Sequence, residues 1–248
     1  MKIVGVIPCR YGSKRFEGKP LVPILGKPMI QWVYERAKDA ALLTDVVIAT
    51  DDDRIQVAVE NFGGTVMMTA SVHRSGSDRV AEAADQLGLE DQDIVVNIQG
   101  DQPAFDQQCL SEVVAPLVDD LDTVMSTLIF KIIDPAELFD SNHVKCVFDH
   151  EDFALYFSRA LIPFAPKDRI DFDVYKHLGI YAYRKHFLTH FVTLPQGRLE
   201  MIERLEQNRV LEYGYRIKVV KTVFDSLEVD RPEDINKLES VLKKEAVS

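Results

Sequence analysis

The sequence predicts an α/β fold: a mainly parallel sheet with helices on both faces, joined in its second half by a smaller antiparallel part. In the first 100 residues, short apolar runs alternate with segments that repeat apolar residues at helical spacing. Strands separated by crossover helices form parallel sheets that are covered on both faces. After residue 122, strand-like runs follow one another with fewer helices between them, which favours antiparallel pairing.

Four short apolar runs are the strands expected in the first half, at residues 2–7, 46–50, 65–68 and 94–98. Between them, apolar residues recur with the period of a helix, as at Ile55, Val59 and Phe62. The resulting helices span about residues 28–41, 55–62 and 80–87, and glycines end the last two. Ligands of parallel sheets lie beyond the carboxyl ends of the strands, so a site is expected in the loops that follow them.

The second half begins at about residue 123, with strand-like runs at 124–130, 144–148, 155–158, 178–183 and 217–221. One helix is expected over residues 198–213 and a closing helix over residues 232–244. No internal repeat or flexible linker separates the two halves. We therefore predict a single domain over residues 1–248, whose elaborated second half contacts a second copy in a homodimer.

Composition narrows the possible functions. The chain has 29 Lys and Arg against 40 Asp and Glu, which gives a net charge of −11. Such an acidic surface disfavours binding to nucleic acid or anionic lipid, although a locally basic pocket can still hold an anionic small molecule. No apolar run is long enough to span a membrane, and the N-terminus lacks the apolar core of a signal peptide. Cys9, Cys109 and Cys146 are far apart and odd in number, which predicts reduced, buried thiols in a cytoplasmic protein.

The loop after the first strand is the most informative segment. Residues 8–20 contain Arg10, Lys14, Arg15 and Lys19 together with two glycines. Cationic side chains and free backbone N–H groups at the end of a parallel strand suit a polyphosphate; the alternative is a solvated basic loop. The chain has no GxxxxGK[ST], which excludes a P-loop nucleotidase, and no GxGxxG after the first strand, which disfavours a dinucleotide enzyme.

Two carboxylates stand where a divalent cation can be held. Asp101 follows the fourth strand, and a carboxylate there can bind Mg²⁺ against substrate phosphates. The alternative is a turn aspartate that accepts hydrogen bonds from its own backbone. Asp230, which precedes Arg231 and Pro232, is either a second metal carboxylate or the N-cap of the last helix.

Residues 73–79, His-Arg-Ser-Gly-Ser-Asp-Arg, precede a predicted helix. Their small residues can approach a base or ribose closely, or they can simply start the helix with Ser77 as its cap. Both interpretations stay open. We interpret the three aspartates at 51–53 as a helix cap. Five histidines have no ligand spacing and are interpreted as surface or satisfied residues: His73, His143, His150, His186 and His190.

Seven short motifs occur in order along the chain. They are R-x-G-S-x-R-x-x-G-K-P from Arg10, H-x-S-G-[ST]-x-R from His73, Q-G-D-x-P from Gln99, Y-F-S-R from Tyr156, H-L-G-I-Y-x-Y from His177, L-E-Q from Leu205 and V-D-x-P-E-D from Val229. In this combination the chain resembles the 3-deoxy-manno-octulosonate (Kdo) cytidylyltransferases, the CMP-Kdo synthetases of lipopolysaccharide synthesis. The resemblance runs from residue 8 to residue 234 and so covers nearly the whole chain.

The resemblance implies a nucleotide-diphospho-sugar transferase fold and the transfer of CMP from CTP to the anomeric hydroxyl of Kdo, with release of pyrophosphate. The residues that it assigns to the CTP phosphates are Arg10, Ser13, Arg15 and Lys19. Those that it places around the cytidine are Ser75, Gly76, Arg79 and Gln99. It assigns Mg²⁺ to Asp101 and Asp230, which form the expected catalytic set with Lys19. The sugar site that it implies comprises Arg159, His177, Tyr181, Glu206 and Gln207.

Without the family pattern, the sugar-site residues have ordinary structural explanations. Arg159 suits a sugar carboxylate, but without the family pattern a surface ion pair is the better explanation. His177 and Tyr181 are four apart on a predicted strand and face one side, as residues of a half-buried sheet face also do. Glu206 and Gln207 suit the exposed face of a helix.

Three functions compete at this point. The resemblance fits a transferase for Kdo or for its 8-amino analogue. The chain departs from the family pattern at Gln102, where Glu is common. A cytidylyltransferase for sialic acid or methylerythritol phosphate would share the phosphate loop and the metal carboxylates but not the motif at 177–181. A non-catalytic CTP-binding module would need the basic loop and neither carboxylate.

Overall fold

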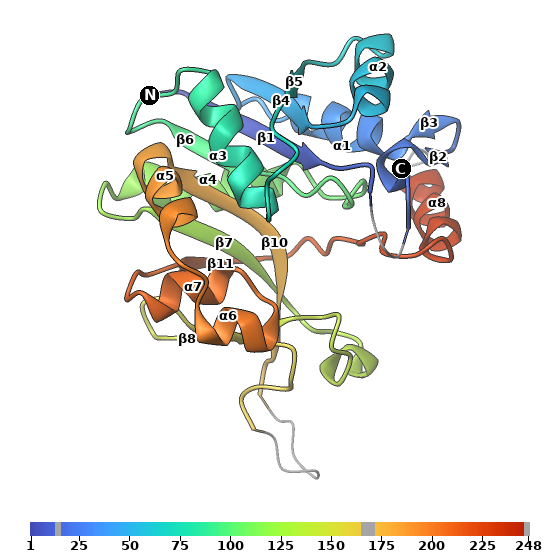
Figure 1. Cartoon of the computed structure of the whole chain (residues 1–248). Helices are drawn as coiled ribbons and strands as arrows, with labels where there is room; N and C mark the ends of the chain where they lie inside the picture. Colours follow the sequence, from blue (N-terminus) through green and yellow to red (C-terminus); the bar gives the residue numbers. More distant parts are fainter. Residues whose placement is uncertain (13–15, 165–171, 246–248) are drawn as a thin grey trace.

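One sheet runs through both halves of the chain (Figure 1). The computed structural model describes residues 1–12, 16–164 and 172–245, and within them the sheet has nine strands. Seven follow in the order β11-β7-β10-β6-β1-β4-β5, and β8 and β9 attach beside β10. Their bounds are β1 Ile3–Cys9, β4 Asp45–Thr50, β5 Val66–Met68, β6 Ile94–Asn97, β7 Met125–Lys131, β8 Lys145–Phe148, β9 Ala154–Ser158, β10 Tyr175–Arg184 and β11 Lys218–Thr222.

The pairing confirms the predicted mixture of directions. β1 pairs in parallel with β4 and β6, β4 with β5, and β11 with β7. β10 runs antiparallel to β6, β7 and β8, and β8 runs antiparallel to β9. Val4, Val6 and Ile7 of the central strand β1 are all buried, as expected for a strand that is covered on both faces.

Helices cover both faces of the sheet, as predicted. On one face, α1 (Met29–Lys38), α2 (Asp53–Asn61) and α4 (Gln108–Asp119) pack through residues such as Val33 and Val113. On the other, α3 (Gly76–Gln86), α5 (Lys185–Thr193) and α7 (Gln207–Glu212) pack through residues such as Val80 and Leu188. None of the helices in the described part of the chain has the length and apolar character needed to cross a bilayer.

Several elements differ from the prediction. The helices α4 and α5 lie where none was predicted, and α4 contains Pro116 in its interior. The single helix expected over residues 198–213 is wrong: the chain forms α6 (Arg198–Glu203) and then α7, separated by a break. Arg204 causes the break because its φ of 55° is left-handed and ends α6.

A buried ion pair holds the two short helices together. Arg209 of α7 donates from Nε and Nη2 to the two carboxylate oxygens of Glu200 in α6, each at 2.7 Å, and both side chains are buried. Replacing Glu200 with Ala would leave the Arg209 charge buried without this partner. We expect Glu200→Ala to lower the free energy of unfolding by about 3–5 kcal/mol, measured by urea denaturation.

The matched control is Asp173→Asn, which removes one partner of the exposed Lys131–Asp173 pair at 2.6 Å. An exposed pair contributes under about 1 kcal/mol, so Asp173→Asn should change the denaturation midpoint little. Equal midpoint shifts for the two variants would contradict the structural role of the Glu200–Arg209 pair.

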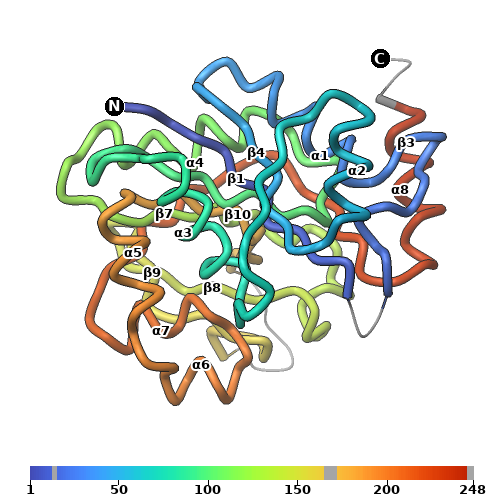
Figure 2. Tube along the Cα trace, turned by 45° about the horizontal axis from the view of Figure 1, so that its top comes forward, coloured from blue at the N-terminus to red at the C-terminus, as the bar shows by residue number. Residues whose placement is uncertain are grey.

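The C-terminal helix packs against the N-terminal part of the chain. In Figures 1 and 2, α8 (Asp234–Glu245) lies beside the hairpin of β2 (Pro23–Ile24) and β3 (Lys27–Pro28). Leu238 and Leu242 of α8 share a buried cluster with Ile24 and Met29. Because α8 is fixed there, the segment before it, which contains Asp230, passes close to the loop that follows β1.

Candidate active site

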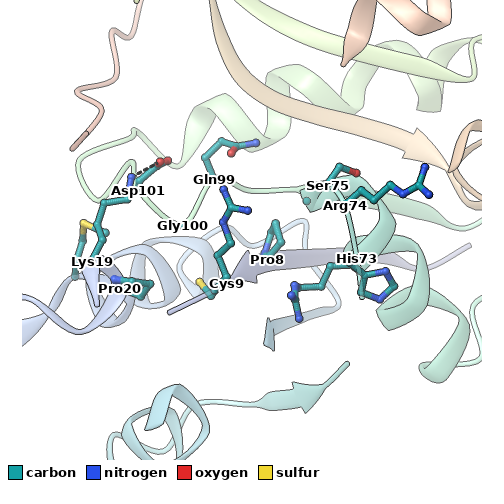
Figure 3. A pocket seen from close by; sticks show the side chains of 14 residues that line it. Pro8, Cys9, Lys19, Pro20, His73, Arg74, Ser75, Gln99, Gly100 and Asp101 are labelled. Carbon is teal, nitrogen blue, oxygen red and sulfur yellow. Dashed lines mark hydrogen bonds and ion pairs between the residues drawn. The ribbon is translucent and has the colours of Figure 1, made fainter. Parts of the chain in front are cut away.

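A cavity of about 280 Å³ lies beyond the carboxyl ends of β1 and β6, where a ligand site was predicted (Figure 3). Its lining comes from three segments: Pro8 to Arg10 with Lys19, Pro20 and Met29; His73 to Gly76 with Arg79; and Gln99 to Asp101. Figure 3 shows Lys19 and Asp101 on one side and His73, Arg74 and Ser75 on the other. We call this space the first cavity.

The loop after β1 folds back on itself and delivers Lys19 to the first cavity. The backbone N–H of Gly18 donates to Tyr11 O at 2.9 Å, which closes the loop just before Lys19. Gly18 has a φ of 70°, and a Cβ there would lie 3.0 Å from the Tyr11 hydroxyl oxygen, so the position requires glycine. Arg10 lines the same cavity. The predicted phosphate ligands Ser13 and Arg15 lie outside the described residues.

Lys19 brings the two predicted metal carboxylates together. Its Nζ lies 2.7 Å from Asp101 Oδ2 and 3.8 Å from Asp230 Oδ1, and it also donates to Val229 O at 2.8 Å. The backbone N–H of Val229 donates to Asp101 O at 2.9 Å, which ties the two distant segments directly. The prediction that Asp101 and Asp230 meet beside the basic loop is therefore confirmed.

The alternative explanation of Asp230 as the N-cap of the last helix is wrong. That helix starts at Asp234, whose Oδ2 accepts hydrogen bonds from the backbone N–H groups of Asp230 and Arg231 at 2.9 and 2.8 Å. Asp234 thus fixes the turn before α8, and the carboxylate of Asp230 remains directed at Lys19.

The two aspartates fit a divalent cation. Asp101 Oδ1 is buried and accepts no hydrogen bond from the described residues. Both carboxylates also face the Lys19 ammonium. The described residues contain no cluster of three or more metal-ligating side chains. Two carboxylates match the coordination that Mg²⁺ prefers in proteins. The ion binds one or two carboxylates and completes its coordination shell with water and substrate phosphates.

The start of α3 forms the opposite wall of the first cavity. Ser75, not Ser77, is the N-cap: its hydroxyl accepts from the Asp78 backbone N–H at 3.2 Å, and Asp78 Oδ2 accepts from the Ser75 N–H at 3.0 Å. Ser75 and Gly76 therefore present the N-terminus of a helix to the cavity, a position that favours anions and hydrogen-bond acceptors.

Arg79 and Gln99 line the same cavity but are held by other parts of the protein. Arg79 is buried, with Nη2 3.0 Å from Asp51 Oδ1 and a short hydrogen bond to the Thr69 hydroxyl. Asp51 is therefore a partner of Arg79, whereas the predicted helix cap is Asp52 alone, which accepts from the Arg54 N–H at 3.0 Å. Gln99 donates to Gly179 O at 2.8 Å.

A second cavity, of about 210 Å³, adjoins the first at Asp101. Its lining includes Arg159, His177 and Asp230 as well as Asp101. Arg159 is fixed there by Nε donating to Glu203 O and Nη1 donating to Ser141 O, both at 2.9 Å. The geometry places a guanidinium in the cavity next to the two aspartates, where an anionic group of a second substrate can bind.

His177 and Tyr181 lie on one side of β10, as predicted, with ring centroids 5.1 Å apart. His177 lines the second cavity, and its ring nitrogen Nε2 lies 2.9 Å from the Thr127 hydroxyl oxygen. Burial lowers the pKa of His177 to about 3, so the ring is neutral at physiological pH. Tyr181 lies behind it in the core, where burial raises its pKa, and the linings of the first and second cavities do not include it.

Comparison with known proteins agrees with this geometry. Residues 4–219 match the family model described as cytidylyltransferase.

The chain belongs to the cytidylyltransferase family.

Several relatives share more than half of its residues. It is 58% identical over 243 residues to the 3-deoxy-manno-octulosonate cytidylyltransferase of Desulfatibacillum aliphaticivorans, covering 98% of this chain and 99% of that one. It is 54% identical over 243 residues to the 8-amino-3,8-dideoxy-manno-octulosonate cytidylyltransferase of Shewanella baltica (strain OS155), with coverage of 98% and 99%.

Solved structures show the same fold. A CMP:2-keto-3-deoxy-manno-octonic acid synthetase complexed with CTP aligns with a TM-score of 0.91 and 39% identity, over 99% of this chain and 100% of that one. A 4-diphosphocytidyl-2C-methyl-D-erythritol synthase from Anaerococcus prevotii aligns with a TM-score of 0.64 and 16% identity, over 98% and 96%. The second likeness shows only that this cytidylyltransferase shares a fold with that enzyme.

In this cytidylyltransferase, Glu206 and Gln207 lie behind the first cavity. Glu206 Oε2 accepts from the Ser77 hydroxyl at 2.8 Å, at the start of α3, and Gln207 is buried. Burial raises the pKa of Glu206, although hydrogen bonds from Ser75 and Ser77 oppose the shift. Neither residue appears in the lining of the first or second cavity.

Two residues of the cytidylyltransferase were missed in the sequence. His73 lines the first cavity, with its Nε2 in a short contact with a Glu82 carboxylate oxygen, although we had interpreted it as a surface or satisfied residue. Glu203 positions Arg159: its carboxylate accepts from the Arg159 backbone N–H at 3.0 Å and from the Ser158 hydroxyl at 2.6 Å. The segment from Glu203 to Glu206 thus connects the second cavity to the start of α3.

Those hydrogen bonds favour the negatively charged form of Glu203. Burial pushes the pKa of Glu203 upward, but hydrogen bonds from Ser158, the Arg159 backbone and Tyr156 outweigh it, so its pKa lies below the usual range. Its signal in the sequence was position: Glu203 lies two residues before the L-E-Q motif that starts at Leu205.

Proposed function

We propose that this chain transfers CMP from CTP to the anomeric hydroxyl of Kdo or of its 8-amino analogue, releases pyrophosphate, and so activates the sugar for lipopolysaccharide synthesis. The observation that carries the proposal is the junction of two cavities at Asp101, with Lys19 and Asp230 beside it. Relatives with these two activities in their names are 58% and 54% identical, and a 39% identical synthetase was solved with CTP.

The first cavity suits CTP. Arg10 and Lys19 would neutralise the triphosphate, and the predicted ligands Ser13 and Arg15, which lie outside the described residues, complete the proposed phosphate site. The cytidine would lie against the residues that form the opposite side of the cavity: Ser75, Gly76, Arg79 and Gln99. The conformation of the Arg79 side chain is fixed because its guanidinium contacts Asp51 and Thr69.

We also propose Mg²⁺ as the cofactor, held by Asp101 and Asp230. When bound, it would supply positive charge for the phosphate oxygens and lower the pKa of the attacking hydroxyl. The reaction forms a bond between the sugar oxygen and the α-phosphorus, breaks the bond from that phosphorus to the β-phosphate oxygen, and releases the hydroxyl proton to the solvent. Catalysis of this kind depends mainly on positioning and electrostatic stabilisation, which Lys19 and Arg10 provide from this chain.

The second cavity suits the sugar. Arg159 would bind the sugar carboxylate, because a planar guanidinium matches a carboxylate in charge and geometry. His177, neutral at physiological pH, would exchange hydrogen bonds with hydroxyl groups rather than balance charge. Tyr181 supports the His177 ring from behind, and Glu206 and Gln207 act on the sugar only through the segment that holds Arg159.

Removing the Arg159 side chain should affect the sugar and not the nucleotide. We expect Arg159→Leu to lower kcat/KM for the sugar by about 10- to 100-fold, the loss of one charge-assisted contact, while KM for CTP stays unchanged. Arg159→Lys should recover part of the loss. Arg216→Leu is the control, because Arg216 is an exposed partner of Glu151 away from both cavities. Steady-state kinetics with each substrate varied measures the split, and an equal rise in both KM values would contradict the assignment.

We further propose that the protein acts in the cytoplasm as a homodimer. All three cysteines are free and buried, as in proteins of reducing compartments. Large apolar side chains are exposed on neighbouring elements of the second half: Leu155 at 60%, Met201 at 55% and Ile202 at 64%. Exposed apolar patches of this kind mark contact surfaces. Sedimentation velocity should show a dimer, and a monomer at every concentration would contradict this proposal.

The test of the proposed function is pyrophosphate release from CTP over a panel of acidic sugars, with and without Mg²⁺. We expect Mg²⁺-dependent release with Kdo or its 8-amino analogue. Turnover with sialic acid or methylerythritol phosphate alone would move the function to the first rival. Tight CTP binding without turnover of any sugar would leave a non-catalytic CTP-binding module.

A further inference from the structure

The sugar site continues into a third cavity of about 580 Å³. It shares six lining residues with the second cavity: Gln102, Asn142, His177, Leu178, Glu228 and Asp230. The proposed function places the carboxylate and anomeric hydroxyl of the sugar near Arg159 and Asp101. The rest of an eight-carbon sugar must then extend away from the nucleotide, and the third cavity is the space that adjoins it on that side.

Among the described residues that line the third cavity, carboxylates outnumber cations. The carboxylates are Glu137, Asp140, Asp225, Glu228, Asp230 and Asp234, and the cations are Lys176, Arg231 and Lys237. Lys176 is already compensated, since its buried Nζ lies 2.8 Å from Glu137 Oε2 and 2.9 Å from Asp225 Oδ2. The guanidinium of Arg159 lines the second cavity, and the described lining of the third cavity has more carboxylates than cations.

Gln102 provides an independent observation: its side-chain oxygen lacks a hydrogen-bond donor among the described residues. The side chain is 4% exposed and lies where the second and third cavities meet. Its Nε2 donates to Leu178 O at 2.7 Å, which fixes the amide. Its Oε1 is buried and accepts no hydrogen bond within residues 1–12, 16–164 and 172–245. A buried acceptor without a donor is costly, so a ligand that brings a hydroxyl or ammonium donor would satisfy it.

We propose that this site is built for a zwitterionic sugar, with a carboxylate at one end and an ammonium at the other, and that it prefers the 8-amino analogue to Kdo. The inference rests on the proposed function and decides between its two sugars. A primary ammonium has three donors and a positive charge, whereas the terminal hydroxyl of Kdo has one donor and no charge. Among carboxylates the ammonium forms charge-assisted hydrogen bonds, which are roughly twice as strong as neutral ones.

The experiment compares the two sugars directly with the wild-type protein. Pyrophosphate release is measured at pH 7.5 with saturating CTP and Mg²⁺, and kcat/KM is determined for Kdo and for the 8-amino analogue. We expect the 8-amino sugar to be preferred by about tenfold or more, the effect of one charge-assisted contact. Raising the salt concentration should reduce the preference, because it screens charge pairs that are partly exposed.

A charge-removing variant tests the cause of the preference. Asp140→Asn keeps an oxygen in the place of Asp140 Oδ1, which accepts from the Asn142 N–H at 2.9 Å, and removes one negative charge. Combined with Glu228→Gln, it should bring the ratio of the two kcat/KM values down by about tenfold. Glu151→Gln is the matched control, because Glu151 is an exposed carboxylate outside all three cavities, and the ratio should stay at the wild-type value.

The outcomes separate the inference from the function. Equal use of both sugars, or a preference for Kdo, overturns the inference and leaves the proposed function intact. A preference for the 8-amino sugar that survives Asp140→Asn with Glu228→Gln also overturns it, since the carboxylates would not be the cause. Turnover of neither sugar overturns the proposed function, and the inference with it.

Discussion

Asp101→Asn is expected to lower kcat by on the order of 10³-fold while the protein stays folded. Among the described residues, Asp101 alone lines both the first and the second cavity, and its Oδ2 is 2.7 Å from Lys19 Nζ. The amide keeps the size of the side chain and removes the negative charge. The substitution would weaken binding of the proposed Mg²⁺ and would also remove the ion pair that orients Lys19. Both the metal and Lys19 act on the transferring phosphate.

The measurement is pyrophosphate release with saturating CTP, Mg²⁺ and sugar, alongside circular dichroism to confirm the fold. Asp45→Asn is a suitable control, because Asp45 is an exposed aspartate at the opposite, amino end of β4. We expect Asp45→Asn to match the wild type. Near-normal turnover in a folded Asp101→Asn protein would refute the assignment of Asp101 to the reaction centre.

Lys19→Ala is expected to reduce kcat by on the order of 10²- to 10³-fold and to weaken CTP binding as well. Lys19 is the cation that both aspartates face, and its ammonium also donates to Val229 O. Without it, two carboxylates and a triphosphate would meet with one positive charge fewer. Charge-assisted contacts contribute about 1.5–3 kcal/mol each, so the binding free energy of CTP should weaken by about this amount. A change in salt concentration should not restore the affinity.

CTP affinity is measured by calorimetry and kcat by pyrophosphate release. The control is Lys27→Ala, since Lys27 pairs with Glu35 at 2.7 Å and lines none of the three cavities. If Lys19→Ala leaves both CTP affinity and kcat unchanged, the loop after β1 does not hold the triphosphate.

The main architecture and the position of the first cavity could be predicted because their causes are local. Apolar runs and glycines mark β1, β4 and β6, and the topology of a parallel sheet brings the following loops to one edge. The basic composition of residues 8–20 gave a charge argument for phosphate that needed no tertiary information. These features depend on neighbouring residues in the chain, which a sequence displays directly.

The meeting of Asp101 with Asp230 was expected only from the family resemblance. Physically it depends on α8, whose Leu238 and Leu242 pack beside Ile24, and on the Val229 N–H bond to Asp101 O. No local pattern around Asp230 encodes either contact. A helix cap was a strong local explanation of Asp230, and only the tertiary structure shows that the helix starts at Asp234, whose carboxylate accepts from the backbone N–H groups of Asp230 and Arg231.

The glutamates of the second half show the same limit more sharply. Glu200, Glu203 and Glu206 follow at intervals of three, a pattern typical of an exposed helix face. Each instead contacts a different partner: Arg209, the Arg159 segment and Ser77. The left-handed Arg204 breaks the helix between them, and helical spacing then no longer predicts which way the side chains point.

The central claim is that Asp101 and Asp230 jointly hold a divalent cation where CTP and the sugar meet. A crystal structure with CTP and Mn²⁺, read from the anomalous scattering of the manganese, tests it most directly. We predict an ion in contact with a carboxylate oxygen of both aspartates and with phosphate oxygens of CTP. An ion bound to the phosphates alone, with both aspartates out of contact in a complex that turns over when sugar is added, would contradict the claim.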